Sequence, residues 1–251
     1  MGGAFAEGML NGEYFQPSDI TVANPTEKKL EPFAHRGASV TTDNKAATHG
    51  ADIVTLFVKP WLVEKVLTEI RSELDYKHQL LIVCAAGITS EQVKGWLDKG
   101  NGTLPAYFFI MPNTAIAVRQ SMTFIVPFGA TEGETQAVKD IFDDLGATYI
   151  TEERLLSAGS ALAGCGIAFA MRYIRAASEG GVQVGFRAKE AQEIVQQTMK
   201  GAVELLKARG THPEEEIDKV TTPGGYTIRG LNEMEHSGFT SAVINGIKAA
   251  L

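Results

Sequence analysis

The stretch ADIVTLFVKPWLVEKVLTEIRSELDYKHQLLIVCA (Ala51–Ala85) decides the fold of this chain. It opens with an apolar β-type run (Ala51–Val58) and closes with a second one (Gln79–Ala85). Between them, the apolar residues of Trp61–Leu74 follow a helical period, which predicts a helix with one buried face. A strand, a helix and a strand in this order form a βαβ unit, so the two strands are expected to lie parallel in one sheet.

The same alternation runs through the first 150 residues. Further strands are predicted at Asp19–Pro25, Ala106–Met111 and Met122–Phe128. Further helices are predicted at Lys28–Arg36, Ser90–Lys99 and Glu134–Leu145. We therefore expect a Rossmann-like α/β domain over residues 1–150, with a largely parallel sheet covered on both faces. Strand signals stop at Thr151, and the helical periods beyond it predict an all-helical domain over residues 151–251.

Composition limits the classes of function. The 251 residues are 44% hydrophobic and 21% charged, a globular balance, and the net charge of −7 argues against nucleic acid as a partner. No uninterrupted apolar run of transmembrane length is evident, so we expect no membrane partner and a cytoplasmic location. Cys84 and Cys165 cannot form a disulfide framework, and we expect buried thiols in a reducing compartment.

The opening MGGAFAEGML (Met1–Leu10) predicts a helix that begins at the first residues. A dinucleotide-binding βαβ unit has a strand, a Gly-rich turn, a helix and a second strand. No strand precedes the helix here, so Gly2 matches only the last glycine of a G-x-G-x-x-G pattern. Gly2 is a candidate for contact with a cofactor phosphate, and the alternative is a small residue that lets the helix pack closely.

The second strand of that unit ends at Asn24 and Pro25. An Asp or Glu at this place would favour the ribose hydroxyl of NAD, whereas the nearby Lys28 and Lys29 favour the 2′-phosphate of NADP. The alternative is a capped helix start with solvated lysines.

Three loops follow predicted strands: Phe57–Pro60 with Lys59, Cys84–Gly87, and Met111–Ala115 with Asn113. Ligands of open parallel sheets lie outside the carboxyl ends of the strands, so these loops are in the expected place. A surface lysine and a Pro-Asn turn are the alternatives for Lys59 and Asn113.

The loop TTPGGYT (Thr221–Thr227) is the most informative of the helical half. Pro223–Gly225 cannot lie inside a regular element, and a helix is expected to begin directly after it. Free N–H groups at such a helix start bind carboxylates or phosphates, while a plain connection between helices is the alternative. The five histidines show no metal-ligand spacing, so no metal is expected. The acidic runs Glu152–Arg154 and Glu214–Glu216 are expected to be solvated helix starts.

Five motifs together resemble one family. They are Val58–Pro60 (VKP), Cys84–Ile88 (CAAGI), Met111–Thr114 (MPNT), Gly164–Phe169 (GCGIAF) and Val220–Leu231 (VTTPGGYTIRGL). In this order they resemble pyrroline-5-carboxylate reductase, the enzyme of the last step of proline synthesis, over essentially the whole chain. The resemblance implies a Rossmann domain and a helical domain that forms a homodimer, and rings of such dimers are known in the family.

The resemblance also implies the chemistry. A hydride from NADPH, or from NADH, reaches the imine carbon of 1-pyrroline-5-carboxylate while the ring nitrogen carries a proton. The Gly224 and Gly225 amides would hold the substrate carboxylate with help from Thr222, and Thr227 would be the catalytic residue, hydrogen-bonded to the ring nitrogen. The implied cofactor contacts are Gly2, Asn24, Pro25, Asn44, Val58, Lys59, Pro60, Ala85, Ala86, Gly87 and Asn113.

The chain departs from the family pattern in three ways. The family's first strand and the first two glycines of its phosphate loop have no counterpart, which would leave backbone unpaired in the sheet. Cys165 and Ile167 replace a serine and a proline, and Phe109 stands where an arginine is usual. A second class of function is therefore kept open, a non-catalytic oligomeric binding protein of the same fold that has lost its cofactor.

Overall fold

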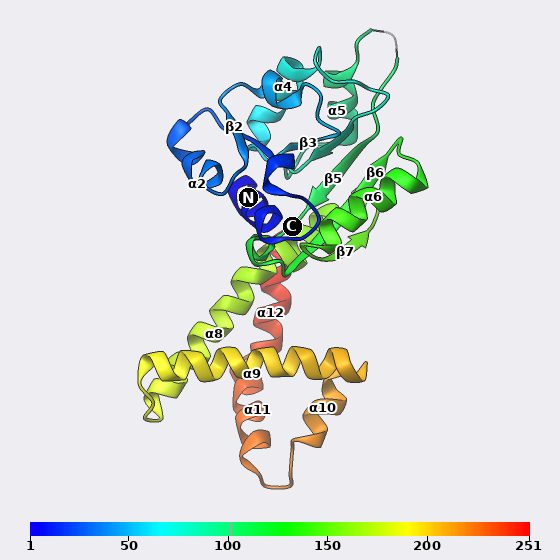
Figure 1. Cartoon of the computed structure of the whole chain (residues 1–251). Helices are drawn as coiled ribbons and strands as arrows, with labels where there is room; N and C mark the ends of the chain where they lie inside the picture. The colour runs from blue at the N-terminus through cyan, green and yellow to red at the C-terminus, as the bar shows by residue number, and fades with distance from the viewer. Residues whose placement is uncertain (101) are drawn as a thin grey trace. The chain divides into compact units, whose positions relative to one another are not determined.

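The computed structural model describes residues 1–100 and 102–251 and separates into two compact units, Met1–Gly164 and Cys165–Leu251 (Figure 1). The first unit includes helix α7 (Glu153–Gly159), because α7 packs against two strands of its sheet, β5 (Tyr107–Met111) and β6 (Ser121–Phe128).

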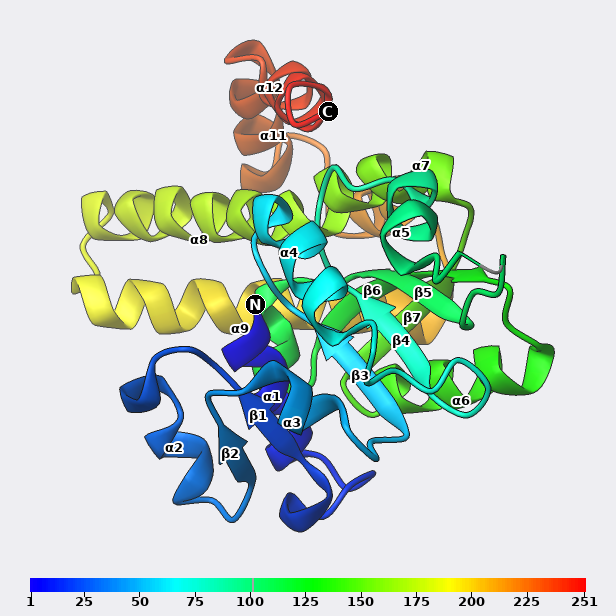
Figure 2. The same cartoon turned by 90° about the horizontal axis from the view of Figure 1, so that it is seen from above.

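The main sheet of the first unit has five strands in the order β3-β4-β5-β6-β7 (Figure 2). Besides β5 and β6, these are β3 (Ile53–Leu56), β4 (Leu80–Val83) and β7 (Gly146–Ile150). All neighbours are parallel except β5 and β6, so the expectation of a largely parallel sheet is confirmed. Strand β7 was not predicted, because GATYI begins with a small, polar-flanked stretch that lacks a clear apolar alternation.

A second, two-stranded sheet pairs β1 (Thr21–Ala23) with β2 (Ser39–Thr41) in parallel. Strand β2, only three residues long, was not predicted. Among the described residues no strand pairs with β3 on its side away from β4.

Helices cover both faces of the five-stranded sheet. They are α1 (Gly2–Asn11), α4 (Pro60–Ile70), α5 (Ser90–Leu97) and α6 (Glu132–Asp143), and the 3-10 turn η3 (Thr114–Val118) packs against α1. The shorter helices α2 (Glu31–Ala34) and α3 (Asn44–Thr48) and the 3-10 turns η1 (Pro17–Asp19) and η2 (Glu27–Lys29) lie around the two-stranded sheet. Alternate residues of β5 point to opposite faces. Phe109 packs with α4 and α5, whereas Phe108 packs with Phe5 of α1 and Phe142 of α6. This alternation makes β5 the centre of two cores.

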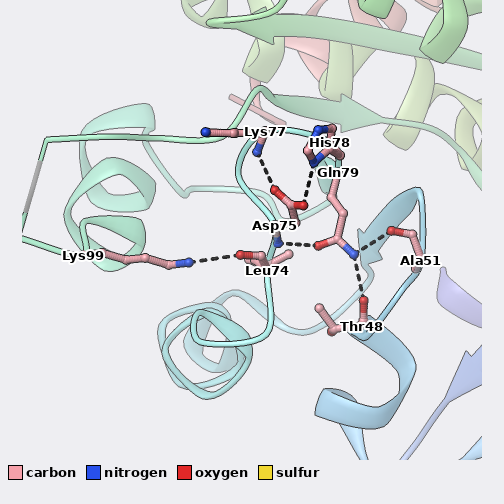
Figure 3. Close-up of polar contacts among 8 residues, drawn as sticks. All are labelled: Thr48, Ala51, Leu74, Asp75, Lys77, His78, Gln79 and Lys99. Carbon is pink, nitrogen blue, oxygen red and sulfur yellow. Dashed lines mark hydrogen bonds and ion pairs between the residues drawn. The ribbon is translucent and has the colours of Figure 1, made fainter.

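Gln79, directly before β4, joins α3 to the main sheet (Figure 3). Its buried side chain donates hydrogen bonds from Nε2 to the carbonyls of Thr48 (2.9 Å) and Ala51 (2.6 Å). Its Oε1 accepts one from the Asp75 amide at 2.8 Å. Because α3 also contacts β1 and β2, this side chain helps to hold the small sheet to the large one.

The second unit is all-helical, as predicted, and contains α8 (Gly166–Gln183), α9 (Ala188–Arg209), α10 (Pro213–Lys219), α11 (Tyr226–His236) and α12 (Phe239–Lys248). Helices α8 and α9 pack along one another, and Gly181 permits the close approach because a Cβ there would lie 2.8 Å from that of Ala191. Gly210 ends α9 with a φ of 63°, as its glycine predicts. A π-helical turn, η4 (Ser160–Cys165), precedes α8 in the chain.

One helix of the described part of the chain, Glu153–Gln183, is long and apolar enough to cross a membrane by length and composition alone. This helix is not the uninterrupted apolar run considered in the sequence, because Ser157 and Ser160 lie within it. A single such helix is weak evidence for a span, because helices of soluble proteins pass the same test.

Candidate cofactor and substrate sites

The predicted cofactor residues of the main sheet follow three parallel strands. Val58–Pro60 come just after β3, Ala85–Gly87 just after β4, and Asn113 just after β5. Because β3, β4 and β5 are parallel neighbours, these residues line one edge of the sheet, the edge where such folds bind ligands.

Gly2 lies at this same edge. It is the first residue of α1, and a Cβ built on it would lie 3.0 Å from the Cβ of Phe57, which follows β3. The N–H groups of the first turn of α1 carry no side-chain cap and can serve an anion. The alternative, a small residue that lets the helix pack closely, also applies to α1: a side chain at Gly8 would collide with the Ile116 carbonyl.

Asn24, Pro25 and Asn44 lie at the ends of the small sheet. Asn24 and Pro25 follow β1, and the Asn24 side chain accepts a hydrogen bond from the Thr26 amide at 3.0 Å. Asn44 opens α3, and its Nδ2 donates to the Glu69 carboxylate at 3.2 Å. Both amide side chains are thus held by the protein itself, which fixes their orientation.

Lys59 is the N-cap residue of α4, without a capping hydrogen bond from its side chain, and is exposed, with its ammonium 6.0 Å from the centre of the Trp61 ring. Trp61 is 75% exposed, which is unusual for the largest apolar side chain, and it was not singled out from the sequence. A cation and an aromatic face therefore stand together at the end of β3, both open to a ligand.

The loop Ala85–Gly87 follows the buried Cys84 at the end of β4 and ends in a turn at Gly87. Gly87 has a φ of 76°, a left-handed conformation that favours glycine. Burial raises the pKa of the Cys84 thiol to about 12, so this cysteine is a neutral core residue and no nucleophile. Cys165 is only half-buried, which corrects the expectation of two buried thiols.

Asn113 lies in a buried polar network. Its Oδ1 accepts from the Ala115 amide at 2.9 Å, and its Nδ2 lies 3.4 Å from the Ala163 carbonyl of the π-helical turn. Its own amide donates to the Ser121 Oγ at 3.2 Å. The side chain thus ties the end of β5 to η4, and one Nδ2 proton remains for a ligand.

The candidate substrate loop, Thr221–Thr227, belongs to the second unit. Gly224 has a φ of 69°, and Gly225 is the N-cap of α11, which has no side-chain cap. The Gly225 amide donates to the Thr222 carbonyl at 2.9 Å. This amide was expected to hold the substrate carboxylate, but the hydrogen bond within the turn already uses it. The groups that suit an anion are the Gly224 amide and the first-turn amides of α11, whose second residue is the exposed Thr227.

The three residues that differ from the family pattern lie in the core or are partly buried. Phe109 is 3% exposed, and its ring makes an edge contact with Phe128 at 5.1 Å, so it fills the core where the family usually has an arginine. Cys165 and Ile167 are half-buried at the start of α8. Among the described residues no group of three or more His, Cys, Asp or Glu side chains could hold a metal ion.

A helix that begins at a glycine beside the carboxyl ends of parallel strands is typical of oxidoreductases that bind a dinucleotide. Residues 1–87 match the family model of NADP oxidoreductases described as coenzyme F420-dependent. Residues 153–251 match the model of the pyrroline-5-carboxylate reductase dimerisation domain. The chain belongs to the pyrroline-5-carboxylate reductase family.

Two relatives illustrate this membership, and two solved structures share the fold. Pyrroline-5-carboxylate reductase 1 of Dictyostelium discoideum is 38% identical over 98% of this chain, which spans 46% of that relative. Pyrroline-5-carboxylate reductase 2 of the same organism is 34% identical over 98% of this chain and 86% of its own length. The Coxiella burnetii enzyme has a TM-score of 0.88 at 26% identity, over 99% of this chain and 93% of that one. The Plasmodium falciparum pyrroline carboxylate reductase, solved with NADP bound, has a TM-score of 0.87 at 24% identity, over 98% of this chain and 90% of that one.

Proposed function

We propose that this chain reduces 1-pyrroline-5-carboxylate to L-proline with a hydride from NADPH, the last step of proline biosynthesis. The observation that carries the proposal is the start of α11 after the loop Thr222–Gly225, where the first-turn N–H groups have no side-chain cap and Thr227 is exposed. The family membership supports the reaction, and the NADP oxidoreductase match over residues 1–87 supports NADPH, with NADH as the second cofactor.

The residues have separate tasks in this reaction. The Gly224 amide and the first-turn amides of α11 hold the substrate carboxylate, with the Thr222 hydroxyl beside them. The Thr227 hydroxyl accepts the hydrogen bond of the protonated ring nitrogen, so that the imine carbon stays electron-poor when it receives the hydride. The protein chiefly supplies position, because the nicotinamide carries the chemistry. NADPH gives up one hydride, the imine bond takes it together with the proton on nitrogen, and NADP⁺ and proline result.

The cofactor contacts are proposed along the edge described above. They are Gly2, Asn24, Pro25, Asn44, Val58, Lys59, Pro60, Ala85, Ala86, Gly87 and Asn113. Lys28 and Lys29, exposed in η2 just after β1, support the 2′-phosphate of NADPH over the free hydroxyl of NADH.

Replacement of Thr227 tests the catalytic assignment. Thr227→Ala should lower kcat/KM for pyrroline-5-carboxylate by about tenfold to a hundredfold, the scale of one lost hydrogen bond at a reacting atom. Thr227→Ser keeps the hydroxyl and is the matched control, expected within about threefold of the unaltered chain. Equal activity of the alanine variant, measured as NADPH oxidation, would remove Thr227 from the mechanism.

The helical unit is proposed to form a homodimer, and larger rings of dimers are a further proposal. The match to a dimerisation model and the exposed apolar side chains of this unit support it. A cytoplasmic location is proposed as well, supported by two unpaired cysteines, one of them buried, and fractionation of cells that express the chain would test it. The alternative, a binding protein without cofactor, is not favoured by relatives that are named as reductases.

A further inference from the structure

A carboxylate distant in sequence holds the start of helix α5. Glu153, the first residue of α7, accepts a hydrogen bond from the Ser90 amide at 2.7 Å through one oxygen. Its second oxygen accepts one from the Ser90 hydroxyl at 2.6 Å. Both bonds are short, Ser90 is buried and Glu153 is half-buried, so the contact is partly shielded from water.

Two further groups fix the same helix start. Thr89 forms a capping box with Gln92, in which the Gln92 side chain accepts from the Thr89 amide at 2.9 Å. The Tyr107 hydroxyl of β5 donates to the Ser90 carbonyl at 3.3 Å, and burial and then the charge of Glu153 raise the pKa of Tyr107. A carboxylate at this end also suits the helix dipole. The expectation that Glu152–Arg154 is merely solvated is therefore wrong for Glu153.

The fixed helix start lies immediately beyond the candidate cofactor loop. Cys84 anchors one end of that loop, because it is buried and its amide donates to the Leu56 carbonyl at 2.9 Å. Only Ile88 and Thr89 separate Gly87 from Ser90 at the other end. A shift of the first turn of α5 can therefore reach the Gly87 amide across only two residues.

We propose that Glu153 is a positioning residue for the cofactor: by holding Ser90, it fixes the loop Ala85–Gly87 in the conformation that binds NADPH. The proposal rests on the proposed function, in which this loop contacts the cofactor. Glu153 itself touches neither cofactor nor substrate in this account. It acts through the start of α5, so its loss should weaken NADPH binding more than the chemical step.

The test is a series of variants with NADPH affinity measured by fluorescence and with steady-state kinetics. Glu153→Ala should raise the Kd and the KM for NADPH about tenfold and leave kcat at saturating NADPH within about twofold, because one charged hydrogen-bonded contact is lost. Glu153→Gln should restore affinity, since its amide can accept from the Ser90 N–H and donate to the Ser90 hydroxyl. Ser90→Ala removes only the hydroxyl and keeps the hydrogen bond from the residue 90 N–H to Glu153. It should raise the Kd for NADPH by an intermediate factor, and it replaces Glu153→Ala in the test if that variant fails to fold.

Two glutamates of the same unit are matched controls. Glu152→Ala removes the adjacent carboxylate, which is 70% exposed and paired with Arg154. Glu134→Ala removes a carboxylate that holds the start of α6 by the same pattern, accepting from the Thr131 amide at 2.6 Å and hydroxyl at 2.8 Å. It should lower the melting temperature without changing the Kd for NADPH. A rise in Kd for Glu134→Ala equal to that of Glu153→Ala, or none for Glu153→Ala, would overturn the positioning role. No NADPH binding by the unaltered chain would refute the proposed function itself, and the positioning role with it.

Discussion

The two units differ most in where their apolar side chains lie. The first unit buries aromatic residues completely between sheet and helices, as at Phe108 and Phe142. In the second unit, only Ser178 and Ala191 are buried among the residues that the structure describes. Met171 and Ile244 are more than half exposed there, at 59% and 52%. The cofactor unit thus carries its own core, whereas the exposed apolar side chains of the helical unit are what the proposed homodimer would bury.

Removal of an apolar contact on the helical unit should therefore have the largest effect. Ile244→Asp in α12 should dissociate the dimer and abolish activity, because an interface that buries isoleucine loses roughly 3 kcal/mol or more when a charge is placed there. Light scattering after gel filtration gives the mass. Val118→Asp is the matched control, since Val118 is 68% exposed in the first unit and should leave the mass unchanged. An Ile244→Asp variant that stays dimeric and fully active would show that the exposed apolar side chains of the helical unit are not buried in a dimer.

Substitution of one glycine in each unit should affect the binding of one ligand and leave that of the other unchanged. A side chain on Gly225 would collide with Thr222, so Gly225→Ala should raise the KM for pyrroline-5-carboxylate about tenfold or more and leave the Kd for NADPH unchanged. Gly87 has open space around it but a φ of 76°, so Gly87→Ala should strain the backbone by about 1 kcal/mol and raise the Kd for NADPH roughly fivefold. Steady-state kinetics with each substrate varied in turn tests both, and a reversed pattern would mean that the sites are assigned to the wrong units.

The smallest effect concerns pH and the helical unit alone. Lys219, Thr211 and Arg209 bind the Glu216 carboxylate and lower its pKa from the ordinary value of 4.5 to about 2. A carboxyl whose folded pKa is lowered stabilises the fold above its unfolded pKa and loses this effect as the pH falls through the folded pKa. Glu216→Gln should thus melt at a slightly lower temperature than the unaltered chain at pH 7, with the difference vanishing near pH 2. A difference that persists in acid would show that packing, rather than charge, causes it.

Much of the fold follows from periodicity in the sequence. The runs that became β3, β4, β5 and β6 alternate or stay apolar over several residues. The amphipathic helices also carry local signals: α4 begins at a proline, α6 at a capping box, and α9 ends at a glycine. Strand β2 has three residues, too few to show a period, so only its pairing with β1 defines it. Long-range polar contacts likewise leave no periodic pattern in the sequence.

The candidate sites were predictable where a motif follows a strand and not where partners are distant. Ala85–Gly87 and Asn113 lie at the ends of their strands as expected. The contact of Glu153 with Ser90 joins residues 63 positions apart, and no local pattern distinguishes Glu153 from the solvated Glu152. The Gly225 amide was expected to bind substrate, yet the turn itself uses it. Sequence patterns therefore locate the loops, while the hydrogen bonds within each loop need the three-dimensional structure.

The most direct test of the central claim follows the hydride. The 251-residue chain is incubated with pyrroline-5-carboxylate and with NADPH deuterated at the transferred position of the nicotinamide, and proline is analysed by mass spectrometry. One proline is expected for each NADPH oxidised, with one deuterium on the former imine carbon. A folded chain that binds NADPH but yields no labelled proline would contradict it.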